Sequence, residues 1–218
     1  MYLSRLILNP RNRSAQRDLA NCQSMHQTVM SAFPPLDGQA ARAQLGVLFR
    51  VDHEAGTGRT VVLVQSKTEP DWSRLPEGYT LGAPVGKSVG MQYGQIREGR
   101  ILRFRLLGNP TRKIDTKSGP NGEKRNGHRV ELFREADQLA WLERKALDAG
   151  FQPVEVQIVG KGSALEAKGR HPAGDLVLKG VVFEGRLQVR DQARFIETLE
   201  RGVGPGKAYG FGLLSIAP

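Results

Sequence analysis

From residue 100 to residue 216, runs of alternating apolar and polar residues are interrupted by two segments in which apolar residues recur every three or four positions. Alternation predicts strands, and the longer spacing predicts amphipathic helices. The segments follow the order strand, helix, strand, strand, helix, strand, and few folds accommodate that order. They are residues 100–110, 134–150, 151–159, 176–189, 191–201 and 207–216.

The helix expected over residues 134–150 has the clearest pattern. Its apolar stripe comprises Leu139, Ala140, Trp141, Leu142, Ala146 and Leu147. Gly150 follows the stripe, and a glycine after the last turn is a common helix terminator. Asp191 suits the N-cap of the second helix, where a carboxylate accepts hydrogen bonds from free N–H groups. The βαββαβ order is that of the ferredoxin-like (RRM-like) fold.

The first half of the chain begins in the same way. The expected elements are a strand over 2–8, a helix over 25–33 and strands over 45–52 and 60–65. Residues 69–99 are rich in Pro and Gly and predict irregular structure, in which a short second helix is conceivable only at 72–75. We therefore predict an α+β protein of two tandem ferredoxin-like domains. Their limits are residues 1–85, a linker over 86–98, and residues 99–218.

The charge of the chain indicates its class of partner. Lys and Arg number 32 against 22 Asp and Glu, which gives a net charge of +10. Such an excess favours nucleic acid or another anionic surface. The most cationic stretch, residues 111–129, is rich in Gly, Pro and Asn, and it predicts an exposed basic loop or hairpin. An ordinary solvated loop is the alternative.

Several classes of function are disfavoured. Cys22 is the only cysteine, so an internal disulfide is excluded. No apolar run suits a signal peptide or a membrane span, which predicts a cytoplasmic protein without a membrane partner. His26, His53, His128 and His171 are scattered without the spacing of a metal site, and no acidic cluster of a two-metal nuclease is present. We expect neither a metal nor a small-molecule cofactor.

The end of the chain, RGVGPGKAYGFG, is unusually rich in glycine. Such a backbone lets N–H groups approach a phosphate closely, and Arg201 and Lys207 add positive charge on either side. The spacing is not that of a nucleotide-hydrolysing P-loop. A tight turn that leads into a buried edge strand explains the glycines equally well. The glycines are Gly202, Gly204, Gly206, Gly210 and Gly212.

His26 is the one histidine that suits proton transfer. It follows a basic segment, near the expected start of a helix, beside the polar Gln23 and Ser24. An imidazole titrates near neutral pH and can act as a general acid or base. A nuclease without metal needs such help and uses the RNA 2′-OH as its nucleophile. Capping, packing or simple exposure to water remains the alternative role for this side chain.

The sequence resembles a known family in several separate stretches. These are MYLSRLILNP at the start, His26 on its short helix, AWLERK, FEGRL and, above all, RGVGPGKAYGFGLLSIAP. Together they resemble the CasE-type endoribonucleases of CRISPR systems, the RNA-processing subunit of Cascade. The resemblance implies two ferredoxin-like domains and metal-independent cutting at the base of a repeat stem-loop. It also implies 5′-hydroxyl and cyclic-phosphate ends, and a product that stays bound among the other Cascade subunits.

The same resemblance implies roles for individual residues. His26 matches the catalytic histidine of the family, whereas Gln23 stands where the family frequently has a tyrosine and cannot readily exchange a proton. The glycine-rich segment is expected against the RNA or in the groove between the domains. The basic hairpin is expected to follow the phosphates of the stem, because an A-form major groove is too narrow for side chains to read. The expected RNA-binding residues are Arg103, Arg105, Arg112, Lys113, Lys117, Lys124, Arg125, Arg129, Lys161, Lys168, Arg170, Arg201 and Lys207.

Two rival interpretations remain open. One is an unrelated RNA-recognition module or assembly factor, and the other stays close to the family. A protein that grips structured RNA within the same kind of complex, without cutting it, would need the same basic surfaces. Gln23 would then mark the loss of cutting, and His26 would be a mere contact.

Overall fold

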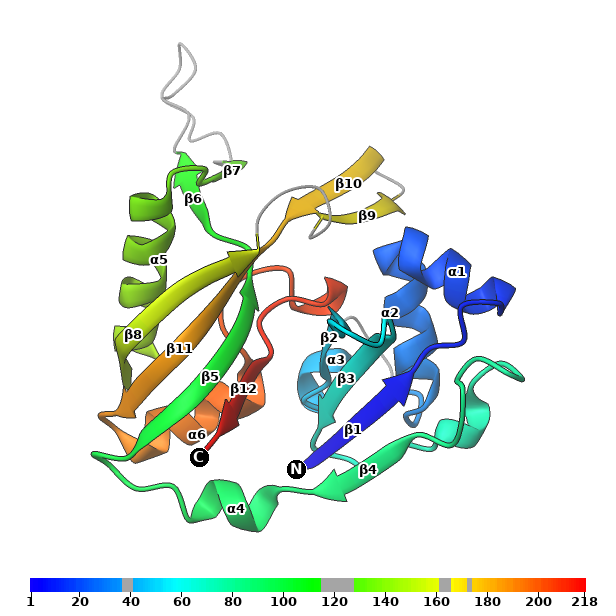
Figure 1. Cartoon of the computed structure of the whole chain (residues 1–218), viewed down its shortest axis with the longest axis horizontal. Coiled ribbons are helices and arrows are strands. Elements are labelled where there is room, and N and C mark those ends of the chain that lie inside the picture. The colour runs from blue at the N-terminus through cyan, green and yellow to red at the C-terminus, as the bar shows by residue number, and fades with distance from the viewer. Residues whose placement is uncertain (37–40, 115–127, 161–165, 172–173) are drawn as a thin grey trace.

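A computed structural model describes residues 1–36, 41–114, 128–160, 166–171 and 174–218. Its framework is a pair of four-stranded antiparallel sheets, one from each half of the chain (Figure 1). The first sheet contains β1 (Tyr2–Ile7), β2 (Leu48–His53), β3 (Thr60–Ser66) and β4 (Val85–Ser88). The second contains β5 (Ile101–Gly108), β8 (Phe151–Gly160), β11 (Val181–Val189) and β12 (Leu214–Ala217).

The two sheets share one strand order. The first runs β2-β3-β1-β4 and the second runs β12-β5-β11-β8. In each sheet the earliest strand lies between the third and the fourth, and the second strand lies beside the third. This is the order of the ferredoxin-like fold, so the prediction of an α+β protein with two such units is confirmed.

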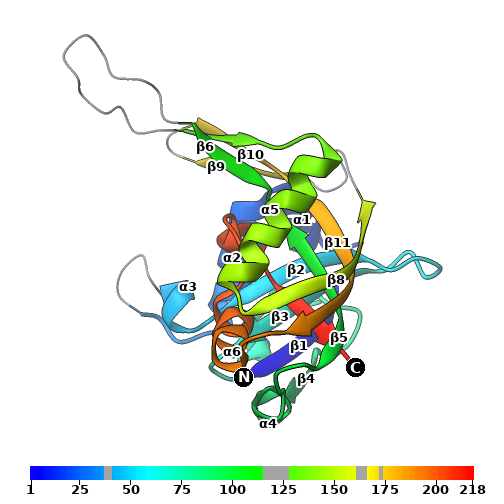
Figure 2. The ribbon, with the colours of Figure 1, turned by 90° about the vertical axis from the view of Figure 1, so that its left-hand side faces the viewer.

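Helices cover one face of each sheet. In the first half these are α1 (Arg13–Ala20) and α2 (Cys22–Ser31), and in the second they are α5 (Glu135–Asp148) and α6 (Gln192–Arg201). Met25 and Val29 of α2 pack in the core of the first sheet. Trp141 of α5 stacks on Phe183 of β11 at 6.1 Å between ring centroids, inside the core of the second sheet. Figure 2 shows α5 and α6 together on one side of that sheet.

Two short ribbons extend beyond the second sheet. β6 (Thr111–Ile114) pairs with β7 (His128–Glu131), and β9 (Glu166–His171) pairs with β10 (Gly174–Lys179). Both ribbons project from the same end of the molecule in Figures 1 and 2. The strand expected over 176–189 is therefore two strands, because Gly180 separates β10 from β11. The basic stretch forms a hairpin at its base, as predicted, and residues 115–127 lie outside the described part.

Three expectations for the first half were incomplete. The basic stretch before His26 is a helix, α1, because the Asn12 side chain caps it by accepting from the Ala15 N–H at 3.1 Å. The region expected to be irregular contains β4, which pairs with β1 across the predicted domain limit, and α4 (Gly90–Gly94). A single 3₁₀ turn, η1 (Trp72–Arg74), stands where the second helix of the fold would be.

Two residues of the predicted apolar stripe of α5 were misplaced. Leu147 is 76% exposed and Ala140 is also exposed, whereas Trp141, Leu142 and Ala146 are buried. Gly150 does follow the helix, with a φ of +75°. The final strand is shorter than expected, because Lys207–Tyr209 form a 3₁₀ turn, η3, before β12 begins at Leu214.

Candidate active site

The break between α1 and α2 sets the position of His26. Asn21 ends α1 and caps α2, since its side-chain oxygen accepts from the Gln23 N–H at 3.0 Å and the Ser24 N–H at 3.3 Å. The helix thus begins at Cys22, and His26 lies one turn after it rather than at the helix start. Because Cys22 and His26 are four residues apart, they share one face of α2.

One nitrogen of the His26 imidazole lacks a hydrogen-bond partner among the described residues. Its Nδ1 is buried, and within the described residues it makes no hydrogen bond. Leaving a buried polar atom unpaired costs about 1–3 kcal/mol, so such an atom is a natural position for a ligand contact. Burial, and then the positive charge of Arg42, lowers the pKa of His26 from its usual 6.5. The ring is therefore neutral at pH 7 and able to accept a proton.

Arg42 is a functional candidate that the sequence did not reveal. It lies on the one-turn helix α3 (Ala41–Gln44), and its Nη1 donates to the Val47 carbonyl at 2.9 Å. Burial lowers the pKa of its guanidinium. Its charge acts on both His26 and Lys207, so it lies close to both. Only the tertiary fold brings Arg42 there, which is why no local pattern pointed to it.

The glycine-rich segment packs between the two halves. Gly202, Gly204, Gly206, Gly210 and Gly212 all have φ between +75° and +91°, a region that favours glycine. A Cβ on Gly204 would lie 2.7 Å from the Trp141 ring, and one on Gly202 would lie 2.9 Å from Leu48 of β2. The turn interpretation thus accounts for the glycines, which allow a close fit between α5 and the first sheet.

Lys207 is held on this segment beside α2. The turn η3 that begins at Lys207 packs against α2 and β2. The left-handed residues Gly206 and Gly210 bracket that turn. Burial lowers the pKa of Lys207, and Arg42, Arg201 and Lys145 lower it further. The charge of Arg42 thus acts on both His26 and Lys207, and we call these three residues the cationic cluster.

A polar pocket of about 350 Å³ lies between the glycine-rich segment, α5 and the base of the basic hairpin. Lys207 and the glycine-rich segment form one wall, Lys145 and Asp148 of α5 form another, and Arg129 of β7 contributes from the hairpin base. Lys145 and Asp148 form a loose ion pair at 3.8 Å. The cations of this pocket, from Arg129 at the hairpin base to Lys207, suit the phosphates of a nucleic acid strand.

The other predicted basic residues have varied surroundings. Arg105 of β5 pairs with Glu184 and, at 3.4 Å, with Asp52, and Arg103 donates to the Pro218 carbonyl at 3.0 Å. These two arginines therefore make contacts within the protein. Arg201 pairs with Glu197 at 2.9 Å on α6.

The two ribbons carry the remaining described candidates. Arg112 and Lys113 are exposed on β6, and Arg129 is exposed on β7 with a 3.3 Å bond to the Thr111 hydroxyl. Lys168 is exposed on β9 and pairs with Glu166 at 3.3 Å, and Arg170 is on the same strand. Lys117, Lys124, Arg125 and Lys161 lie outside the described residues.

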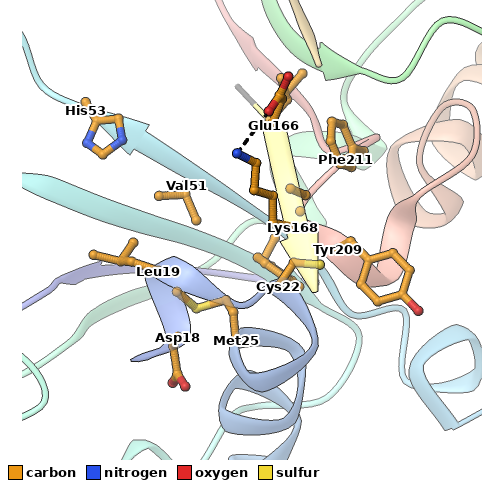
Figure 3. A pocket seen from close by; sticks show the side chains of 14 residues that line it. Asp18, Leu19, Cys22, Met25, Val51, His53, Glu166, Lys168, Tyr209 and Phe211 are labelled. Carbon is orange, nitrogen blue, oxygen red and sulfur yellow. Dashed lines mark ion pairs between the residues drawn. The ribbon is translucent and has the colours of Figure 1, made fainter. Parts of the chain in front are cut away.

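The ribbon β9–β10 closes over the start of α2. A Cβ on Gly169 would lie 3.0 Å from the Cys22 sulfur, so the strand passes close to the helix. Beside this contact is a mostly apolar pocket of about 230 Å³ (Figure 3). Leu19, Met25 and Val51 form its floor, and Lys168 and Glu166 reach across it from β9. The β9–β10 ribbon therefore encloses this pocket on the side opposite α2 and β2.

The described residues contain neither a metal-binding cluster nor a membrane-spanning helix. No group of three or more His, Cys, Asp or Glu side chains that could hold a metal ion occurs in the described part of the chain. None of the helices seen there has the length and apolar character needed to cross a membrane.

The whole chain has close relatives. A family model described as "CRISPR associated protein" matches residues 1–218. The CRISPR-associated endoribonuclease Cse3 of Thermus thermophilus is 40% identical, and the CRISPR system Cascade subunit CasE of Escherichia coli is 32% identical, each over 100% of both chains.

A solved structure agrees with these matches in fold. The structure of Thermus thermophilus Cse3 bound to an RNA representing a pre-cleavage complex superposes with a TM-score of 0.79 at 39% identity, over 100% of this chain and 98% of that one. Since the family model spans every residue and the relatives match from end to end, the chain belongs to this family of CRISPR-associated proteins.

Proposed function

We propose that the chain is an endoribonuclease that cuts the repeat stem-loop of CRISPR precursor RNA to give mature CRISPR RNA. The observation that carries this proposal is the unpaired, buried nitrogen of His26 within the cationic cluster. The chain also matches, over its whole length, a relative named as a CRISPR-associated endoribonuclease. Affinity for RNA alone would not require a neutral imidazole beside two cations.

The reaction follows from the state of His26. A neutral imidazole accepts the proton of an RNA 2′-OH, and the resulting oxygen nucleophile attacks the adjacent phosphorus. The bond from phosphorus to the 5′-oxygen breaks, which leaves a 2′,3′-cyclic phosphate and a 5′-hydroxyl. In this proposal the Arg42 guanidinium, whose charge acts on His26, stabilises the extra negative charge of the phosphorane-like transition state.

The basic surfaces then hold the substrate. The exposed side chains of Arg112 and Arg129 at the hairpin base, and Lys145 in the polar pocket, form a path for the phosphates of one strand. Double-stranded RNA is recognised mainly through its shape and backbone, so a thin cationic hairpin suits a stem. The exposed Lys168 on β9, a strand that packs against α2, adds to the positive surface.

Further details of the proposed function are taken from the relatives of the chain. The proposal includes cutting without a metal or cofactor, retention of the product among other Cascade subunits, and a cytoplasmic location. The relative named as a Cascade subunit is 32% identical over both full lengths and supports the assembly.

Cleavage of a labelled repeat hairpin in EDTA tests the function. We expect wild type to cut the RNA, and His26→Ala to bind it but not cut it. His53→Ala is the matched control, because His53 is an exposed histidine bonded only to the Thr60 hydroxyl at 3.1 Å within the described residues. A 2′-deoxy substitution at the cleavage nucleotide should also block cutting. Tight binding by wild type without cutting would instead establish the non-cleaving subunit, the role that Gln23 favours.

A further inference from the structure

A small pocket at the base of the two ribbons has no part in the proposed reaction. Its volume is about 260 Å³, and it lies where β7 leads into α5 and where β10 leads into β11. Phe133 and Lys179 are exposed at its rim, whereas Pro110, Gln138 and Val181 are buried in its floor. None of its described lining residues belongs to the cationic cluster.

The Gln138 side chain brings a free hydrogen-bond acceptor to this floor. Gln138 is 5% exposed, and its Nε2 donates to the Leu132 carbonyl at 2.8 Å and to the Phe133 carbonyl at 3.4 Å. Because a carbonyl accepts and cannot donate, these two bonds fix which end of the amide is nitrogen. The other end, Oε1, is buried and makes no hydrogen bond to any described residue. An unpaired buried acceptor is costly, so the site suits a ligand that donates an N–H.

The size and charge of the pocket limit what that ligand is. The space is much larger than the roughly 30 Å³ that one water molecule occupies in the liquid. Two carboxylates line the described part of the pocket, and each is paired with a lysine: Glu131 with Lys179 at 3.3 Å and Glu166 with Lys168 at 3.3 Å. No uncompensated charge is thus left there to attract a phosphate or a guanidinium. The pocket favours an uncharged group with an N–H donor.

Phe133 adds a flat apolar surface at the rim. Its side chain belongs to a residue that is 70% exposed, and the Lys179 ammonium lies 5.0 Å from the centroid of its ring. A cation above an aromatic face is attracted to it, which restrains the ring. Unpaired bases of RNA stack on aromatic side chains of this kind and donate or accept hydrogen bonds at their edges. An uncharged, planar N–H donor is therefore available in the proposed substrate.

The pocket is also placed where RNA is expected. Asn109, just before β6, is buried and donates to the Lys179 carbonyl at 2.8 Å, so it joins the bases of the two ribbons. The Leu132 N–H donates to the Pro110 carbonyl at 3.0 Å and closes the base of the hairpin. Both ribbons project from this end of the molecule (Figure 2). A stem held along the hairpin therefore brings its unpaired neighbouring nucleotides close to the pocket.

We propose that this pocket binds one unpaired base of the repeat RNA, and that the base carries an exocyclic amine. Phe133 stacks on the base, and Gln138 Oε1 accepts a hydrogen bond from the amine. Adenine, cytosine and guanine have such a donor, whereas uracil has carbonyl oxygens instead. This inference rests on the proposed function and adds to it a base that the protein recognises outside the cleavage site.

Two matched hairpins test the proposal by their affinity. Both have the repeat stem and a 2′-deoxy nucleotide at the cleavage site, so that neither is cut. In one hairpin every other unpaired nucleotide is adenosine, and in the second it is purine riboside, which lacks only the amine. We expect wild type to bind the adenosine hairpin about threefold to tenfold more tightly, the effect of one hydrogen bond.

Variants of Phe133 assign that preference to this pocket. Phe133→Ala should weaken binding of the adenosine hairpin at least about fivefold, because stacking is lost, and should abolish the preference. Phe133→Tyr keeps an aromatic ring and should retain both. Leu147→Ala removes another exposed apolar side chain, on α5, and should match wild type on both hairpins.

A variant of Gln138 tests the acceptor itself. Gln138→Leu should bind the two hairpins equally, with the affinity that wild type has for the purine riboside hairpin. The substitution also removes the bonds to the Leu132 and Phe133 carbonyls, so thermal unfolding accompanies the measurement. If this variant does not fold, the two hairpins with wild type and the Phe133 variants still decide the question.

The outcomes separate this inference from the function beneath it. Equal affinity of wild type for the two hairpins would overturn the base site. So would a Phe133→Ala protein that binds RNA normally but no longer co-purifies with Cascade subunits, because the pocket would then take a protein side chain. Cutting of the unmodified hairpin is scored separately. A preference for the amine without cutting supports the base site and overturns the endoribonuclease, and cutting without a preference does the reverse.

Discussion

The guanidinium of Arg50 donates a 2.8 Å hydrogen bond to the Ser215 hydroxyl, and so joins β2 of the first sheet to β12 of the second. Arg50 is only 3% exposed, and it also donates at 3.3 Å to the Leu213 carbonyl. Its charge is balanced by Asp52 at 2.9 Å. The two halves are thus tied by a buried ionic group whose hydrogen bonds cross between them.

Replacing Arg50 should therefore loosen the whole molecule. We expect Arg50→Ala to lower the free energy of unfolding by about 3–5 kcal/mol, because it removes the buried partner of Asp52, which keeps only Arg105 at 3.4 Å, and the donor to the Ser215 hydroxyl. Urea unfolding followed by circular dichroism measures this. Arg74→Ala breaks the exposed pair with Asp71 and should cost about 0–1 kcal/mol. Similar losses for both variants would show that Arg50 does not hold the halves together.

Gly204 should not tolerate a side chain. Gly204→Ala places a methyl group 2.7 Å from the Trp141 ring at a φ of +76°, so we expect a loss of about 1–3 kcal/mol from strain and overpacking. Thermal unfolding provides the measurement. Gly82→Ala is the control, since nothing lies within 4 Å of the added carbon. A Gly204→Ala protein as stable as wild type would mean that the segment can move away from α5.

The rate of cutting should stay high in weakly acidic solution. The pKa of His26 is lowered from 6.5, chiefly by burial, so the ring stays neutral and active somewhat below pH 6.5. Protonation at lower pH removes the base, and the rate should then fall about tenfold per pH unit. Single-turnover rates from pH 5 to pH 8 would show this. A midpoint above 6.5 would contradict the buried, cation-flanked setting of the ring.

Salt should reveal which hairpin residues contact phosphate. If Arg112 neutralises one phosphate, Arg112→Ala should weaken binding and reduce the slope of log affinity against log salt by about 0.7–0.9. Titrating the 2′-deoxy repeat hairpin at several salt concentrations measures the slope. Lys87→Ala serves as a charge-matched control on β4. An unchanged slope for Arg112→Ala would exclude that contact.

Local patterns predicted the elements that depend on local physics. The alternation around Arg103 and the stripe around Trp141 recur as β5 and α5, and Asp191 caps α6 by accepting from the Arg194 N–H at 3.0 Å. The cap at Asn12 was equally visible, but no helix was predicted for the basic segment that follows it. Their helix is amphipathic and largely exposed, so only Ala15 and Asp18 are buried.

Features that arise only from tertiary contacts could not be predicted from the sequence. The pairing of β4 with β1 links strands about 80 residues apart, and no short pattern announces it. The contribution of Arg42 to the site arises in the same way, because its charge meets His26 and Lys207 only after folding. His26 and Lys207 were both found from sequence as candidates, and their catalytic and RNA-binding roles stay predictions, as do the domain limits at residues 85 and 98.

The contact between β9 and α2 gives the protein a built-in reporter. Cys22 is the only thiol of the chain, and it is buried beside Gly169 of the ribbon. Burial raises its pKa, so its reaction with a maleimide dye is slow while the ribbon is seated. The labelling rate of unmodified protein therefore measures how often the ribbon lifts, and a hairpin RNA that holds the ribbon down would protect the sulfur from the dye.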